Sequence, residues 1–142
     1  MSVTGHITLR DRVFKVKQAS VKHREDLWSI EIETHAEEFD GERWAPCLYH
    51  QGLRLHAHVA AELPGESTSW GKPGDADYPH PEFGVMYVFG HEVVRHCKLT
   101  FGPLVASEIE VTWEGECDVF WEGEYFEDVP FRCKCTAVAN AG

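Results

Sequence analysis

No stretch of this 142-residue sequence approaches the run of about 20 apolar residues that a membrane-spanning helix needs. The first ten residues also lack the apolar core of a secretory signal peptide. Both absences predict a cytoplasmic protein that does not associate with a membrane. Apolar residues make up 43% of the chain, which is ordinary for a globular protein, so disorder is not expected. The length suits a single domain over residues 1–142.

The cysteines lack the pattern of a disulfide framework, because their number is odd and no secretory signal precedes them. They are Cys47, Cys97, Cys117, Cys133 and Cys135. Cys133 and Cys135 share one face if they lie on a strand, and their Cβ atoms are then poorly placed for a disulfide. We therefore expect reduced thiols that are mostly buried as small apolar groups rather than bound to zinc.

Positive charge is missing from residues 99–131, which contain no Lys or Arg. The formal net charge is −11 and is unevenly distributed. Residues 1–24 carry six Lys or Arg and one acid, a net of +5, whereas residues 25–142 carry seven Lys or Arg and 23 acids, a net of −16. Such a surface repels nucleic-acid phosphates and attracts cations or a basic protein. The alternative interpretation is that the charge serves solubility alone.

Motifs that would fix a reaction are also absent. The sequence has no Gly-x-Ser-x-Gly elbow, no glycine-rich phosphate loop, no dinucleotide fingerprint and no cysteine among basic residues. Acidic residues are abundant, but nothing in the sequence singles one out as a general acid or base. We therefore expect a binding protein more than an enzyme, with no catalytic residues and no cofactor.

What the sequence does contain is a period of two, the pattern of half-buried strands. Trp28, Ile30 and Ile32 alternate with polar residues, and from Ile109 to Trp121 most odd positions are apolar while most even positions are acidic. Odd positions become apolar again from Val129. These patterns predict an all-β, mainly antiparallel fold: a sandwich or a partly open barrel of about eight strands, with at most one short helix.

The tetrad Trp-Glu-Gly-Glu occurs at residues 113–116 and again at residues 121–124. In a hairpin, paired residues share a face, so a two-residue loop at Gly115 would mix core and solvent positions. Either a loop of odd length or a single long strand with Gly115 as a bulge keeps the faces consistent. In both cases Trp113 and Trp121 point inward, and a loop over residues 122–128 leads into the last strand.

Residues 53–63 alternate as a strand through Val59 but also contain good helix formers, so a strand with a short helix at its end is predicted. Residues 64–82 are rich in Pro, Gly, Ser and Asp and form a long predicted loop. Loops of this length inside a compact domain are commonly functional or disordered. Trp70 and Tyr78 in this segment are candidate binding anchors, unless they cover the edge of the core.

A His-x-His pair, His56 and His58, together with Glu62 and the later His96, resembles the metal motif of the cupins. That resemblance covers about a dozen residues and implies a metal-dependent enzyme with these four ligands. The spacing from Gly52 is too short, and the second cupin motif has no counterpart around His91 or His96. No metal is therefore favoured, and His56 and His58 are interpreted as polar residues of an amphipathic strand.

Three function classes follow. The favoured one is a non-enzymatic acidic protein that docks on a basic protein partner, similar in size and surface to the immunity proteins that neutralise toxins. Its predicted contact residues are Glu108, Glu110, Glu114, Glu116, Asp118, Tyr125, Trp70 and Tyr78. The alternatives are the cupin-like enzyme and a small-ligand carrier with a pocket under residues 64–82.

Overall fold

A computed structural model describes residues 4–10, 12–39, 41–70, 85–87, 91–121 and 124–140. This part of the chain forms twelve strands and one short 3-10 helix. The first six strands are β1 (Gly5–Leu9), β2 (Arg12–Arg24), β3 (Leu27–Thr34), β4 (Glu37–Phe39), β5 (Glu42–Trp44) and β6 (Cys47–Leu53). After the 3-10 helix η1 (Ala60–Glu62) come β7 (Ser67–Trp70), β8 (Val85–Tyr87), β9 (His91–Val93), β10 (Arg95–Val105), β11 (Glu108–Trp121) and β12 (Glu124–Asn140). None of these described elements is a helix long and apolar enough to cross a membrane.

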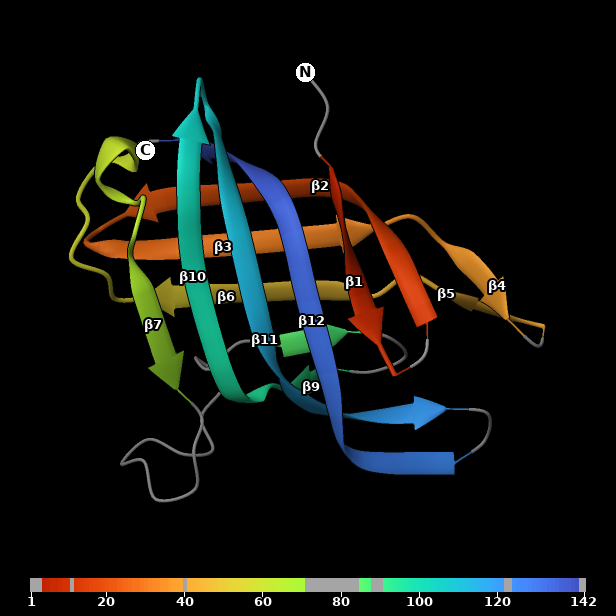
Figure 1. Cartoon of the computed structure of the whole chain (residues 1–142). Helices are drawn as coiled ribbons and strands as arrows, with labels where there is room; N and C mark the ends of the chain where they lie inside the picture. Colours follow the sequence, from red (N-terminus) through yellow and green to blue (C-terminus); the bar gives the residue numbers. More distant parts are fainter. Residues whose placement is uncertain are drawn as a thin grey trace.

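The all-β prediction is confirmed. Ten strands form one sheet in the order β7-β10-β11-β12-β1-β2-β3-β6-β8-β9, and β4 and β5 form a separate hairpin. Figure 1 shows that β10, β11 and β12 run steeply across β2, β3 and β6, so that one curled sheet supplies two crossed layers. The two layers cover each other as in an orthogonal sandwich. The strand number exceeds the predicted eight, because several strands have only three or four residues.

The sheet curls where β1 begins. β1 lies between β12 and β2 and pairs antiparallel with both, but beyond its first residue β12 pairs directly with β2 in parallel. Gly5, at the start of β1, has a φ of +130°. A Cβ there would collide with the backbone of Lys134 and Cys135, so this close approach of β1 to β12 requires glycine.

The core lies between the two layers and follows the predicted period of two. From Ile109 to Val119 and from Val129 to Ala139 the odd positions are buried, apart from the half-buried Gly115, and the even positions face outward. Phe14, Trp28 and Trp44, from the N-terminal strands, are also fully buried. All five cysteines lie in the described part of the chain, and each is a thiol rather than half of a disulfide. The sulfurs of Cys133 and Cys135 are 3.9 Å apart on the buried face, as expected for strand neighbours of one face.

The first tetrad lies within one long strand, as the second alternative predicts, but the prediction that Gly115 is a bulge is wrong. Gly115 pairs with Phe131 at an inward position of β11. A Cβ at this position would lie 2.7 Å from the sulfur of Cys97 and 2.9 Å from the ring of Phe131. The glycine therefore leaves room for two core side chains. The irregularity in the β11–β12 pairing lies farther along, between Cys117 and Val119.

Three predicted boundaries are wrong. Residues 67–70 of the predicted loop over residues 64–82 form β7. β12 already begins at Glu124, so residues 124–128 belong to a strand and not to the predicted loop. The strand predicted through Val59 ends at Leu53, and residues 54–59 are irregular before η1. Leu53 is the last residue of β6 that pairs with β3. Beyond it the chain is held by a side chain, because the indole N–H of Trp28 donates to the carbonyl of Ala57 at 2.9 Å. The predicted short helix is present as η1. The side chain of Trp121 lies outside the described residues.

Candidate functional site

The predicted acidic residues share one face of β11. We call Glu108, Glu110, Glu114, Glu116 and Asp118 the acidic row. All five alternate with buried residues and point away from the core, as the period of two predicts. Glu114 is exposed and the other four are half-buried, because β10 and β12 flank β11 on both sides.

Cations from both neighbouring strands offset much of the acidic row. Glu114 lies opposite Lys98 of β10 and Arg132 of β12, with 4.0 Å between the Arg132 Nε and a Glu114 oxygen. Glu116 is 2.7 Å from Nδ1 of His96, also on β10. Only the cations of the last strand were expected near the acidic row, because nothing in the linear sequence places β10 beside β11. The row itself is therefore less negative than its sequence predicts.

Arg95 joins the far end of the acidic row to β12. Its guanidinium donates to Asp118 at 2.5 Å and to Asp128 at 2.7 Å. Asp118 also accepts the backbone N–H of Asp128 and the hydroxyl of Tyr125, both at 3.0 Å. Burial acts to raise the pKa of Asp118, but the hydrogen bonds from Arg95, Asp128 and Tyr125 outweigh it and hold the pKa below its usual range. Asp118 is thus an ionised structural residue of this end of the sheet.

Two left-handed residues mark the irregular pairing at this end. Asp128 has a φ of 55° and His96 a φ of 50°. Each lies where one strand contributes an extra residue to the ladder, which is the geometry of a β-bulge. A bulge bends its strand and increases the twist. Figure 1 shows the consequence: the last residues of β11 and the first of β12 turn sideways from the body of the sheet.

This bent segment, residues 119–121 of β11 and 124–128 of β12, is called the hairpin end. Glu124, Glu127 and Asp128 are exposed on it, and Tyr125 is 53% exposed. Tyr125 was predicted as a contact residue. Glu124, Glu127 and Asp128 were missed, although "EGEYFED" is the most acidic part of the cation-free span, because the segment was taken for a connecting loop.

We expect Asp118→Ala to lower the free energy of unfolding by about 1–3 kcal/mol, because it removes charged hydrogen bonds and leaves Arg95 without one of its acceptors. The amide of Asp128 should lose its acceptor and exchange faster with solvent. Hydrogen exchange with denaturant unfolding measures both effects. Glu116→Ala is the matched control on the same face, with an expected change within about 1 kcal/mol for a partly exposed pair. Equal effects of the two substitutions would contradict this role for Asp118.

Trp70 is not in an exposed loop. It ends β7, is half-buried, and packs against the core. Its ring centroid is 5.1 Å from that of His50 on β6 and 5.6 Å from that of Trp113 on β11. Trp70 therefore covers the edge of the core between the two layers, the second of the two interpretations given to it. Tyr78 lies outside the described residues.

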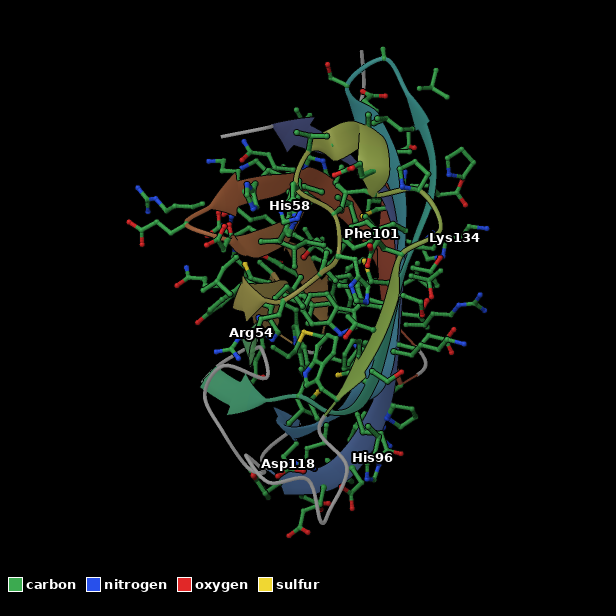
Figure 2. The ribbon with its side chains drawn as sticks, turned by 90° about the vertical axis from the view of Figure 1, so that its left-hand side faces the viewer. Arg54, His58, His96, Phe101, Asp118 and Lys134 are labelled. Atoms are coloured by element: carbon green, nitrogen blue, oxygen red, sulfur yellow. The ribbon has the colours of Figure 1, made fainter. Side chains whose placement is uncertain are left out.

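The four candidate metal ligands do not come together. Figure 2 places His58 and His96 at different ends of the molecule. Glu62 accepts the backbone N–H of His58 at 2.8 Å, and this hydrogen bond lowers the pKa of its carboxyl. His56 and His58 follow β6 rather than lying on a strand. Across the described ranges, no three His, Cys, Asp or Glu side chains are arranged to hold a metal ion.

A hollow of about 450 Å³ lies on the outer side of the N-terminal strands. It is lined by Gln18, Ala19, Ser20, Glu31, Glu33 and Val138. These residues come from β2, β3 and β12 and not from the predicted loop over residues 64–82. Residues 71–82 of that loop lie outside the described part of the chain, so the predicted pocket beneath it stays a prediction.

Comparisons with protein-family models, with curated proteins and with solved structures find no match for this chain. The hairpin end and the faces beside it are therefore the features of this chain from which a function can be inferred.

Proposed function

We propose that this protein is a non-enzymatic binding protein whose hairpin end, together with the adjoining acidic row, docks on a basic protein partner. The observation that carries the proposal is the position of Glu124, Glu127 and Asp128 beside the exposed ring of Tyr125, on a segment that turns away from the sheet. Arg95 is held between Asp118 and Asp128, so it is engaged within the site. A net negative, aromatic surface remains for a partner.

The parts of this surface have different roles. Glu124 and Glu127 are exposed and would attract a basic partner over distances of about a Debye length, roughly 10 Å at 0.1 M salt. Tyr125 offers a flat amphipathic ring of the kind enriched at the centres of interfaces. Asp118 and Arg95 hold the hairpin end in its bent position, so that less conformational entropy is lost when a partner binds. A toxin-neutralising protein of the immunity type, acting in the cytoplasm, is the specific form of this function that we favour.

We expect the pair of substitutions Glu124→Lys and Glu127→Lys to slow association with the partner by about tenfold, because electrostatic steering acts on the rate of encounter. Affinity capture from the source organism supplies the partner, and stopped-flow mixing over a series of salt concentrations measures the rate. The association rate of the parent should fall steeply as salt rises past about 0.1 M.

Glu31→Lys with Glu33→Lys is the matched control. Both residues are exposed on β3, and the substitutions change the net charge by the same amount away from the hairpin end. This variant should associate nearly as fast as the parent. A captured partner that is acidic, or equal rates for the two double variants, would show that the hairpin end is a solvated surface with no docking role.

A further inference from the structure

Two lysines with a histidine between them form a row on the outer face of the N-terminal strands. His6 of β1 pairs with Lys134 of β12 on one side and with Lys15 of β2 on the other. Directly paired residues share a face, and the next residue along β1, Ile7, is fully buried. Lys134, His6 and Lys15 therefore point outward together, and Figure 2 shows Lys134 on the outer side of its layer. We call these three residues the basic row.

Among the described residues, the basic row differs from Arg95 and Arg132 in having no acidic partner. Arg95 and Arg132 both lie within 4.0 Å of a carboxylate. Among the described residues, no ion pair is formed by Lys134, His6 or Lys15. The lysines of the basic row are thus a local positive charge, not neutralised by a neighbouring carboxylate, in a chain of net charge −11.

We propose that the outer face of β12, β1 and β2 is a second docking surface, which binds a short carboxylate-rich segment of a protein. Adjacent strands are about 4.8 Å apart, so Lys134 and Lys15 stand about 10 Å apart at their backbones with His6 between them. Carboxylates on alternate residues of an extended segment are about 7 Å apart, within reach of two flexible lysines. Thr8 and Thr112 flank the row and offer hydroxyl donors to the same segment.

The surroundings favour a short acidic peptide over a nucleic acid. Lys134 lies opposite Thr112 of β11, and Glu110 and Glu114 are the next outward residues on either side of Thr112. A long polyanion lying over the basic row would extend over this acidic row and be repelled by it. A segment with two or three carboxylates can bind the lysines without reaching that far. The inference does not depend on the proposed function, because it uses other residues and a ligand of opposite charge.

The test uses a rhodamine-labelled nine-residue peptide of alternating Glu and Gly, with binding followed by fluorescence anisotropy at low and moderate salt. Lys15→Gln with Lys134→Gln should weaken binding by about tenfold, through loss of two charge pairs. Lys22→Gln with Lys98→Gln is the matched control, because it removes the same charge from outward positions elsewhere on the sheet. The control should change the affinity by less than about threefold.

Circular dichroism of both variants establishes that they are folded. No binding of the peptide to the parent, or an equal loss of affinity in the two variants, would overturn the proposal. Tighter binding of a single-stranded DNA of equal charge would overturn the assignment to a protein segment. The variant Glu124→Lys with Glu127→Lys should still bind the peptide, so failure of the proposed function and failure of this inference give different results.

Discussion

Trp113→Ala is expected to lower the free energy of unfolding by about 3–5 kcal/mol. The indole is fully buried at the inward face of β11, and its ring centroid lies 5.6 Å from that of Trp70 and 6.4 Å from that of Phe131. Removing it deletes a large apolar side chain between the two layers and leaves a cavity that strands of one continuous sheet cannot easily close. Denaturant unfolding followed by circular dichroism measures the loss.

The control for this substitution is Glu114→Ala, one residue along the same strand. Glu114 is exposed, its contact with Arg132 is 4.0 Å, and its removal should change stability by no more than about 1 kcal/mol. The two variants therefore test the inward and outward faces of β11 at adjacent positions. Similar unfolding midpoints would contradict the register in which Trp113 faces the core.

The stability of the folded protein should fall by about 3 kcal/mol between pH 7 and pH 4 because of His50 alone. His50 lies on β6, is 5% exposed, and accepts the backbone N–H of Gly52 through Nδ1 at 3.0 Å. Burial lowers the pKa of His50 to about 4 from an ordinary value of 6.5. Between pH 6.5 and about 4, His50 is therefore protonated in the unfolded chain but neutral in the folded chain. The free energy of unfolding declines as the pH falls through this range.

Acidic residues also titrate below pH 5, so the measurement is a difference between variants. His50→Gln keeps a side-chain acceptor for Gly52 but carries no titrating group, and its unfolding free energy should decline less than that of the parent over this range. His58→Gln removes an exposed histidine and should keep the decline of the parent. A parent and a His50→Gln variant with parallel pH profiles would contradict the burial of a neutral His50.

The position of His50 also connects the core to the edge that Trp70 covers. The two rings meet edge to face at 5.1 Å, and Trp70 in turn contacts Trp113. Protonation of His50 would place a charge within this aromatic group, where few acceptors can compensate for the lost water. Acid destabilisation should therefore begin at the edge formed by β7 and β6, remote from the hairpin end.

The sequence by itself determined the β class and the alternation of inward and outward side chains along β11 and along β12 from Val129 onward. It did not determine the register between the two strands, since Glu124 to Asp128 belong to β12 and not to the predicted loop. A period of two is a local property, since alternate side chains on a strand point to opposite faces whatever the strand pairs with. The inward direction of Trp113 and Cys133 and the outward direction of Glu114 follow from it, and the structure confirms them. The end of the strand before His56 was not determined, because alternation continues there beyond the last ladder hydrogen bond.

Only the tertiary structure decided which charges meet. Arg95 and Asp118 are 23 residues apart, and no periodicity indicates that β10 pairs with β11 at that register. The basic row depends in the same way on β1 lying between β12 and β2, which joins His6 to a residue near the other end of the chain. Strand order and bulges are set by packing of the whole core and not by local sequence pattern. The acidic hairpin end and the basic row are therefore separate surfaces only in the folded sheet.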